Sequence, residues 1–314
     1  MDFRVSWQNF MTQLKAENIK NISVGIGVFD GVHLGHAELL RSLSDFAEKN
    51  NSYPVALTFA PHPRALTQPE NAPKLLVPLA QRIELLKQHG AKKVFVIDFN
   101  EKFSAIEPED FLDIISSSKV VRLDCITVGR NWHFGHLGAG DTVLVAEFCQ
   151  ARNITFIPIE ELKVDGNKIS SANIRTFVAA GQLDIAKSML GYDYFLHGTV
   201  VRGFSFASDK LEHPTANLEI NSEICPVDGV YAAKVAIDGK IYPAAVNIGV
   251  APSFEFNKKQ HRIEVHVLDF SGDLYGRELS VSLLKHLRNE RIFESAEALK
   301  AQIMLDIQQI RNLI

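Results

Sequence analysis

The sequence predicts a two-domain α/β protein, in which a doubly wound parallel sheet is followed by a small antiparallel β-barrel with a C-terminal helix. Two observations predict this fold. Over residues 24–159, short apolar runs alternate with amphipathic helical patterns, which is typical of a parallel sheet covered by helices. Over residues 198–270, β-branched runs follow one another with turns between them, which favours a barrel. We therefore expect domains of residues 1–186 and 187–314.

The first domain consists of two kinds of element that alternate along the chain. The expected strands span residues 24–28, 55–59, 93–99, 125–128 and 155–159, and the expected helices span residues 37–48, 81–89, 108–116 and 142–152. The first of these helices carries an apolar face made of Leu39, Leu40, Leu43 and Phe46. This spacing is typical of a helix that packs against a sheet.

The second domain is expected to contain strands and one closing helix. The expected strands span residues 198–202, 229–237, 241–248 and 263–270. Asp238 and Gly239 separate two of these strands, and an Asp-Gly pair in this position is typical of a tight hairpin turn. The helix is expected from Ser295, with an apolar stripe made of Leu299, Ile303, Ile307, Ile310 and Ile314. We expect this stripe to cover the barrel.

Composition and charge narrow the class of protein. The chain has 314 residues, of which 46% are hydrophobic and 22% charged, and its formal net charge is -4. It therefore has no overall positive charge that would attract nucleic acid. The sequence contains neither the pattern of a signal peptide nor an apolar run long enough to cross a membrane. Cys125, Cys149 and Cys225 form no CxxC or zinc pattern. We expect a cytoplasmic monomer or weak homo-oligomer that binds neither nucleic acid nor a membrane.

A glycine-rich turn with two histidines follows the first expected strand. It reads GIGVFDGVHLGH from Gly25 to His36. It is not a dinucleotide fingerprint, because Asp30 stands where G-x-G-x-x-G needs its third glycine, and the sequence contains no P-loop motif. A helix that begins here would offer free N–H groups to a phosphate, and His33 and His36 could add hydrogen bonds. This pattern favours nucleotidyl transfer, although two surface histidines on a loop are the simpler alternative.

The segment FDGVHLGH resembles the motif of the FAD synthetase family, within the Rossmann-like HIGH-type nucleotidyltransferases. Three further segments match that family in order: FAPHP at residues 59–63, VGRNWHFG at residues 128–135 with Gly140 and Asp141 after it, and ISSANIR at residues 169–175. The resemblance implies catalytic roles for His33, His36 and Arg175. It implies ATP and phosphate binding by Gly31, Gly35, Ser170 and Ser171. It implies flavin binding by Phe59, Pro61, His62 and Asn131.

The C-terminal half resembles the riboflavin kinase module of the same bifunctional family. The matching stretches are LGYDYFLHGTVVRG, PTANL, PVDGVYAAKV, AVNIG, IEVHVLDFSGDLYG and LRNERIF. The resemblance implies that Thr215 and Asn217 bind the ATP phosphates and Mg²⁺, and that Glu264 is the base toward the flavin ribityl hydroxyl. The chemistry agrees, because Mg²⁺ accepts hydroxyl and amide oxygens and a carboxylate can take the proton of an alcohol. A glutamate on the solvent face of a strand is the alternative for Glu264.

Three segments depart from the family pattern, and one of them is VGRNWHFG, where Trp132 stands in place of the usual phenylalanine and His133 in place of a basic or polar residue. Ser208 and Asp209 stand where the family usually has Gly-Arg, and Glu212 stands where it has a later glycine. Added carboxylates repel phosphate, so we expect weak ATP binding at the kinase site. In the ISSANIR segment, Ala172 stands where the family usually has threonine. One hydroxyl is therefore lost near the expected phosphate site.

The two halves together predict an enzyme that phosphorylates riboflavin to FMN and then adenylylates FMN to FAD, using ATP and Mg²⁺. Two alternatives remain open. One is a monofunctional FAD synthetase whose kinase module only binds flavin. The other is a non-catalytic flavin-nucleotide binder. The presence of His33, His36, Asn131, Arg175 and Glu264 argues against it, because a binder needs no base beside a hydroxyl.

Overall fold

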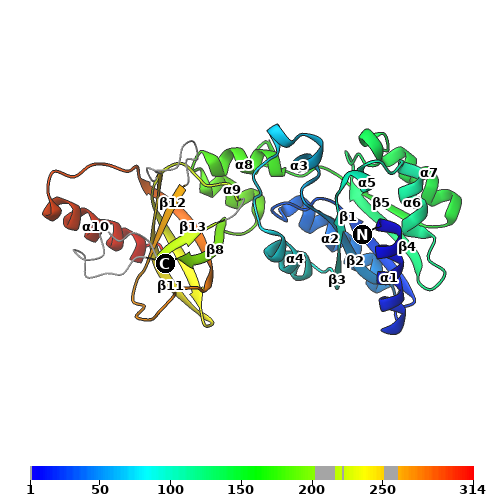
Figure 1. Cartoon of the computed structure of the whole chain (residues 1–314), viewed down its shortest axis with the longest axis horizontal. Helices are drawn as coiled ribbons and strands as arrows, with labels where there is room; N and C mark the ends of the chain where they lie inside the picture. Colours follow the sequence, from blue (N-terminus) through cyan, green and yellow to red (C-terminus); the bar gives the residue numbers. More distant parts are fainter. Residues whose placement is uncertain (1, 202–215, 221–222, 251–260) are drawn as a thin grey trace. The chain divides into compact units, whose positions relative to one another are not determined.

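The computed structural model describes residues 2–201, 216–220, 223–250 and 261–314, and Figure 1 traces its elements. The chain forms two compact units. The first unit comprises Met1–Pro73 and Leu79–Ile169, and the second comprises Lys74–Pro78 and Ser170–Ile314. The short segment Lys74–Pro78 therefore belongs to the second unit, although residues of the first unit flank it in the sequence. The domain boundary after residue 186 stays a prediction.

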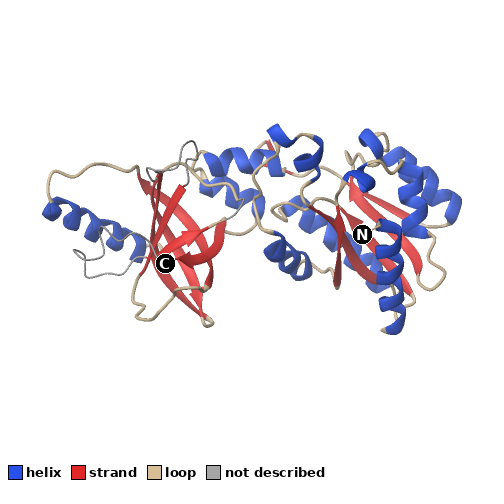
Figure 2. Ribbon diagram, viewed as in Figure 1, coloured by secondary structure: helices blue, strands red, loops and turns tan. Residues whose placement is uncertain are grey.

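The first unit is built around a five-stranded sheet (Figure 2). Its strands, in spatial order, are β3 (Lys93–Asp98), β2 (Tyr53–Ala60), β1 (Asn21–Ile26), β4 (Arg122–Gly129) and β5 (Thr155–Ile159). Each neighbouring pair is parallel, and Val24 at the centre lies between Val55 and Ile126. These pairings confirm the predicted doubly wound parallel sheet. The first strand ends at Ile26, so Val28 belongs to the turn that follows rather than to the strand.

Helices cover both faces of this sheet, which explains why its strands are apolar on both sides. The helices of one face are α1 (Phe3–Ala16), α6 (Pro108–Ser116) and α7 (Thr142–Arg152). Those of the other face are α2 (Leu34–Lys49) and α4 (Leu79–Gln88). The remaining elements of the unit are α3 (Pro63–Thr67), η1 (Pro69–Asn71), α5 (Glu101–Ser104), η2 (His136–Gly138), β6 (Lys163–Val164) and β7 (Asn167–Lys168). Trp7, Phe111 and Phe148 lie in the first core, and Leu43 and Leu86 lie in the second.

The strand order identifies the edge of the sheet where a ligand is expected. The chain runs outward from β1 through β2 to β3 and then returns to β4 on the other side of β1. In open parallel sheets, ligands bind outside the carboxyl ends of the strands at the point where the order reverses. The turn of residues 27–33 leaves the carboxyl end of β1 and leads into α2. The fold therefore places the two motif histidines at this edge.

The second unit contains a closed barrel (Figure 2). Its strands, in order around the barrel, are β10 (Gly229–Ile237), β11 (Lys240–Val250), β12 (His261–Val267), β9 (Ala216–Glu219), β8 (Phe195–Val201) and β13 (Glu278–Arg288). Every neighbouring pair is antiparallel, which confirms the predicted barrel. Strands β9 and β13 were not predicted. Two helices, α8 (Ser171–Ala179) and α9 (Leu183–Leu190), precede the barrel.

The predicted hairpin and the predicted closing helix are both present. Asp238 and Gly239 have φ angles of 50° and 79°, which the tight hairpin turn requires. Helix α10 (Ala296–Arg311) begins after Ser295, whose hydroxyl accepts a hydrogen bond from the amide of Ala298. Its side chains Ile307 and Ile310 pack against Ala232, Ala245, Leu268, Leu284 and Leu287. The predicted stripe ends one turn early, because the helix stops at Arg311 and Ile314 is exposed.

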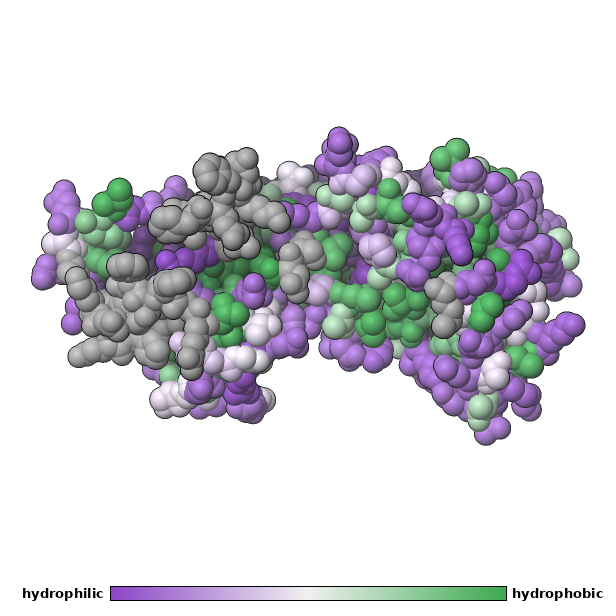
Figure 3. Space-filling model, in the orientation of Figure 1, coloured by the Kyte–Doolittle hydropathy of each residue, from purple (hydrophilic) through white to green (hydrophobic). Residues whose placement is uncertain are grey.

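The outer surface is mainly hydrophilic on the face seen in Figure 3, with smaller hydrophobic patches between the polar side chains. No helix in the described ranges combines the length and the apolar character needed to cross a bilayer.

Candidate functional site

The turn between β1 and α2 has an unusual backbone. Phe29 and Val32 are buried residues with positive φ angles of 56° and 34°, and Gly31 has a φ of 79°. A non-glycine residue in the left-handed region costs about 1 to 3 kcal/mol, and such strain persists only where the surroundings hold it. Gly31 tolerates the left-handed angle because it has no Cβ. Packing and hydrogen bonds around the turn must therefore stabilise its shape.

His33 joins this turn to helix α2. It is the N-cap residue, and its Nδ1 accepts a hydrogen bond from the amide of His36 at 3.3 Å. A nitrogen that accepts carries no proton, so His33 is neutral and its Nε2 carries the N–H. The ring is stacked on that of His36, with centroids 3.6 Å apart and 13° between planes. A Cβ on Gly35 would lie 3.2 Å from the His33 ring, so a larger residue there would press on that ring.

His36 is also neutral near pH 7. Burial lowers its pKa well below the usual value, and the neighbouring His33 and Arg82 lower it further. Its Nδ1 atom is buried and has no hydrogen-bond partner in the described part of the chain. The ring of Phe29 packs against the His36 ring in a T-shaped arrangement, with the ring centroids 5.1 Å apart. The two histidines are thus uncharged N–H donors at a helix N-terminus, whose free N–H groups favour an anion.

Arg82 on α4 lies beneath this turn and was missing from the sequence prediction. It is only 2% exposed, and it donates from Nη1 to the carbonyl of Val28 at 2.8 Å and from Nη2 to the carbonyl of Phe59 at 3.0 Å. Burial lowers the pKa of its guanidinium, and the carboxylate of Asp30, itself 1% exposed, opposes this effect. One feature of the sequence indicates that Arg82 is buried. It stands four residues before Leu86, so both side chains lie on the inward face of the helix.

The FAPHP segment follows β2 at the same edge of the sheet. Phe59 is 7% exposed and packs in the core against Phe99 and Phe103, so its predicted contact with flavin stays a prediction. Pro61 is exposed. His62 begins helix α3, and its Nδ1 accepts from the amide of Arg64 at 3.1 Å. Of the three predicted flavin contacts in this segment, Pro61 and His62 therefore offer more surface to a ligand than Phe59 does.

Asn131 follows β4 and completes this edge. It is exposed, and its amide donates to Oε1 of Glu161 at 2.6 Å. Lys168 forms an ion pair with the same carboxylate and, as the largest effect, lowers the pKa of Glu161. Next to it, Trp132 is stacked on Phe134 with centroids 4.3 Å apart. The carboxyl edge of the first unit thus brings together the predicted residues that follow β1, β2 and β4.

The ISSANIR segment lies mostly in the second unit. Ser170 begins helix α8, and its hydroxyl accepts a hydrogen bond from the amide of Asn173 at 3.2 Å. Ser171 is the first residue of that helix. Arg175 donates from Nε to the carbonyl of Lys74 at 2.8 Å. All three predicted residues therefore belong to the unit that contains the barrel, whereas His33 belongs to the first unit.

Glu264 and Asn217 are two of the residues predicted for the kinase reaction, and they lie on neighbouring strands. Glu264 lies on β12 directly opposite Asn217 of β9, and on its other side it faces Asn247 of β11. Its Oε1 atom forms an ion pair with Nη2 of Arg262 at 2.6 Å. Thr215, together with the predicted loop residues Ser208, Asp209 and Glu212, lies outside the described residues.

Glu264 also lines a cavity of 560 Å³ in the second unit. Polar strand residues, among them Asn247 and His266, share this lining with Glu264. Apolar residues that follow β13 or belong to α10 complete it, namely Ile292, Phe293, Leu299, Ile303 and Ile307. The volume lies within the usual range for small-molecule sites. Several of these lining residues, including Asn247 and Phe293, lie in the quoted stretches AVNIG and LRNERIF but were not singled out.

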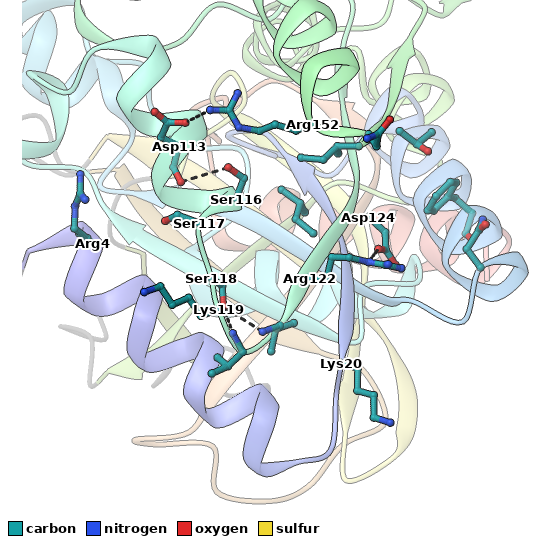
Figure 4. A pocket seen from close by; sticks show the side chains of 18 of the residues that line it. Arg4, Lys20, Asp113, Ser116, Ser117, Ser118, Lys119, Arg122, Asp124 and Arg152 are labelled. Atoms are coloured by element: carbon teal, nitrogen blue, oxygen red, sulfur yellow. Dashed lines mark hydrogen bonds and ion pairs between the residues drawn. The ribbon is translucent and has the colours of Figure 1, made fainter.

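A cavity of 1190 Å³ lies at the opposite, amino-terminal edge of the parallel sheet (Figure 4). Its lining includes Arg122 and Thr155, the first residues of β4 and β5. Two of its arginines are paired, Arg122 with Asp124 and Arg152 with Asp113, both at 2.6 Å. Because such sheets bind ligands at the carboxyl edge, we assign this cavity to neither reaction.

Comparison with known protein families assigns the two halves of the chain to two different family models. The family model described as FAD synthetase matches residues 15–173, and the model described as riboflavin kinase matches residues 190–314. The first match contains both motif histidines, and the second contains Glu264 and the 560 Å³ cavity.

Curated relatives match over nearly the whole chain under one name, bifunctional riboflavin kinase/FMN adenylyltransferase. The protein of Buchnera aphidicola subsp. Schizaphis graminum is 34% identical over 93% of this chain and 94% of its own. That of Pseudomonas fluorescens is 35% identical over 92% and 91%, and that of Bacillus subtilis is 33% identical over 94% and 93%.

A solved structure has the same fold. The crystal structure titled macrolide-efflux protein from Streptococcus pneumoniae matches with a TM-score of 0.83 at 28% identity, over 93% of this chain and 94% of that one. The extent and identity of the matches to the curated relatives decide the family. The chain belongs to the family of bifunctional riboflavin kinase/FMN adenylyltransferases.

Proposed function

We propose that this chain carries out both reactions of its family. The barrel phosphorylates riboflavin to FMN with ATP, and the parallel-sheet domain transfers AMP from ATP to FMN and releases pyrophosphate. The observation that carries the proposal is that one chain contains two neutral histidines at a helix N-terminus and, separately, a carboxylate lining a ligand-sized cavity. The first arrangement suits stabilisation of phosphate charge, and the second suits activation of an alcohol.

In the kinase reaction, Glu264 acts as the base. The apolar wall of the cavity suits the flat ring system of riboflavin, and the polar strand residues suit its ribityl hydroxyls. Glu264 accepts the proton of the terminal ribityl hydroxyl as that oxygen attacks the γ-phosphorus of ATP, and ADP leaves. Arg262 orients the carboxylate by holding Oε1.

The kinase site also fits a magnesium ion. Asn217 supplies an amide oxygen opposite Glu264, and Mg²⁺ accepts such a ligand when phosphate oxygens and waters complete its shell. Thr215 is the second proposed ligand, in line with the PTAN resemblance. Bound Mg²⁺ would neutralise part of the charge on the ATP phosphates. The same ion is proposed to accompany ATP in adenylyl transfer.

In adenylyl transfer, an oxygen of the FMN phosphate attacks the α-phosphorus of ATP and pyrophosphate leaves. This oxygen is already ionised near pH 7, so the step needs no base. His33 donates from Nε2 to a phosphate oxygen, and His36 adds a second uncharged donor. The residues proposed to bind the ATP phosphates are Gly31, Gly35, Ser170, Ser171 and Arg175. Those proposed to contact the flavin are Phe59, Pro61, His62 and Asn131.

The proposed location is the cytoplasm, and the proposed state is a monomer or weak homo-oligomer with small-molecule partners. The location is supported by the cysteines, which are all free, as is usual in a reducing compartment. Burial raises the pKa of Cys125 to about 12 and that of Cys149 to about 11, so both thiols are unreactive. Size-exclusion chromatography with light scattering measures the oligomeric state.

One experiment tests the proposed function. The purified chain is incubated with riboflavin, ATP and Mg²⁺, and FMN and FAD are separated by chromatography. We expect FMN first and FAD later, and we expect FAD and pyrophosphate when FMN replaces riboflavin. If FMN is returned unchanged over a range of Mg²⁺ concentrations and pH values, adenylyl transfer is wrong. If FAD forms from FMN but riboflavin is never phosphorylated, the monofunctional alternative is correct.

A further inference from the structure

The buried arginine below the histidine turn has no part in the mechanism described so far. Arg82 reaches from α4 to two different segments, because it bonds the carbonyl of Val28 in the turn and the carbonyl of Phe59 at the end of β2. The first segment carries the motif histidines, and the second leads into Pro61. One side chain therefore connects the proposed phosphate-binding and flavin-binding parts of the carboxyl edge.

The turn needs such a connection. Its buried residues Phe29 and Val32 have left-handed backbone angles, which are unfavourable unless neighbours fix them. Among the described residues, two side chains donate to the Val28 carbonyl, namely Arg82 at 2.8 Å and the hydroxyl of Thr58 at 2.9 Å. Thr58 belongs to β2, so both bonds join the turn to neighbouring elements. A charged donor makes the stronger bond of the two.

We propose that Arg82 is a positioning residue for adenylyl transfer, which fixes the turn that carries His33 and His36 against the segment that carries Pro61. The proposal rests on the proposed function of the first domain. Loss of the two bonds would let these segments move relative to each other, and a displacement of about 1 Å in an active site can lower a rate by about 10²-fold. A guanidinium reaches two carbonyls at once because its donors are fixed in a planar fork, whereas the single ammonium of lysine does so poorly.

Arg82 also acts on His36 electrostatically. The groups that face this imidazole are His33 from the start of α2 and Arg82 from α4, both of which oppose its protonation. Asp30 in the turn faces Arg82 and partly balances its charge. Removal of the Arg82 cation should therefore make His36 easier to protonate. This effect gives a readout that a purely structural role would not change.

The test compares Arg82→Met, Arg82→Lys and the wild-type chain. The control is Lys87→Met, since Lys87 lies on the same helix but is exposed and paired with Glu84. Each protein is assayed for FMN adenylylation and for riboflavin phosphorylation. The titration of His36 is followed by NMR of the imidazole signal, which is assigned by its loss in His36→Ala. Wild-type formation of FAD is measured first, so that a failure of the proposed function is recognised separately.

For Arg82→Met we expect kcat/KM for adenylylation to fall about 10²-fold and the His36 titration to move to higher pH, with kinase activity unchanged. For Arg82→Lys we expect a fall of about tenfold with the titration near that of the wild type, because the charge remains. The proposal is overturned if an active wild-type chain and a folded Arg82→Met variant share the same kcat/KM or the same titration. If Arg82→Met does not fold, the Arg82→Lys assay decides. If neither variant folds, Arg82 is purely structural and the proposal is wrong.

Discussion

At the scale of single residues, the two proposed sites hold their chemical groups in opposite ways. The rings of His33 and His36 are stacked on each other, and burial of His36 keeps that imidazole uncharged. Glu264 is instead a carboxylate held by Arg262 at the lining of a cavity. The first site is thus suited to donate hydrogen bonds to phosphates that are already charged. The second is suited to accept a proton.

Replacement of His36 should affect one reaction only. In His36→Ala the helix N-terminus loses one donor toward the phosphates, and loss of a preorganised donor costs about 10² to 10³ in kcat. We expect adenylylation of FMN to fall by about 10²-fold or more and phosphorylation of riboflavin to stay unchanged. Steady-state assays of each half-reaction measure both effects. The matched control is His136→Ala, because His136 is exposed and contacts Glu107. A folded His36→Ala variant that loses both activities equally would contradict the two-site proposal.

Replacement of Glu264 should have the converse effect. Glu264→Gln keeps the size of the side chain but cannot accept a proton, and a general base contributes about 10² to 10⁴ in rate. We expect FMN formation to fall by about 10²-fold or more, while FMN adenylylation continues. Glu219→Gln is the control, since Glu219 is an exposed carboxylate on the neighbouring strand β9. Near-full kinase activity of Glu264→Gln would remove Glu264 from the mechanism.

Short motifs predicted several residues that the structure brings together, and the reason is that each motif follows a strand of the same sheet. The histidine turn, Pro61 and Asn131 come after β1, β2 and β4, so the parallel topology places them at one edge. Arg82 was not predicted because its role depends on a helix packing under two loops. An arginine in an amphipathic segment usually faces solvent, and its burial depends on the packing of the whole unit.

At the scale of elements, helix α10 shows how a short segment completes a site. It supplies Leu299, Ile303 and Ile307 to the lining of the 560 Å³ cavity. Two ion pairs connect it to the rest of the barrel unit. Asp306 pairs with Arg288 at 2.8 Å in a largely buried position, with its side chain 5% exposed, and Arg311 pairs with Asp269 at 2.7 Å in an exposed one.

These two ion pairs should differ strongly in their contribution to stability. Asp306→Ala leaves Arg288 without its buried partner, and such a loss costs about 3 to 5 kcal/mol. Asp269→Ala removes a solvated pair worth about 1 kcal/mol or less. We expect the first substitution to lower the free energy of unfolding of the barrel and to weaken riboflavin binding, since α10 forms a wall of the cavity. Urea unfolding and riboflavin fluorescence titration measure these effects. Equal effects of the two substitutions would refute the anchoring role of Asp306.

Helix α1 and strand β13 were not predicted, although both have regular apolar patterns. Helix α1 buries Phe3, Trp7, Phe10, Met11 and Leu14, which is a regular helical stripe. It lies at the start of the chain, outside the alternating strand and helix pattern. Strand β13 alternates Leu279, Val281 and Leu283 inward. Its partners β8 and β10 are distant in sequence, and only the closure of the barrel gives this strand its place.

At the scale of the whole molecule, the buried histidine links stability to pH. The pKa of His36 is lowered in the folded chain, while an unfolded histidine has a pKa of about 6.5. Below about pH 6.5 the unfolded chain therefore binds more protons, so unfolding becomes easier as the pH falls. The stability that His36 contributes is fully present above this pH and is lost as the pH decreases toward its folded pKa.

We expect the free energy of unfolding of the first domain to decrease below about pH 6.5, with a slope of up to about 1.4 kcal/mol per pH unit for one proton. His36→Asn should flatten this slope. Burial also lowers the pKa of His89, so His89→Asn should flatten it further. Urea unfolding at several pH values measures the slope for each variant. An unchanged slope in His36→Asn would show that this imidazole is not held neutral by the fold.

The path of the chain through the two compact units has a consequence for their biosynthesis and for domain truncation. Residues 74–78 belong to the second unit, where Leu75 forms a β-bridge with Glu223 and accepts a hydrogen bond from the amide of Ile224. During translation, this segment leaves the ribosome long before its partners are made. A fragment that ends near residue 186 would likewise lack Glu223 and Ile224, the partners of Leu75. Neither unit can therefore be isolated with all its contacts by cutting one peptide bond, and point substitutions are the better way to separate the two activities.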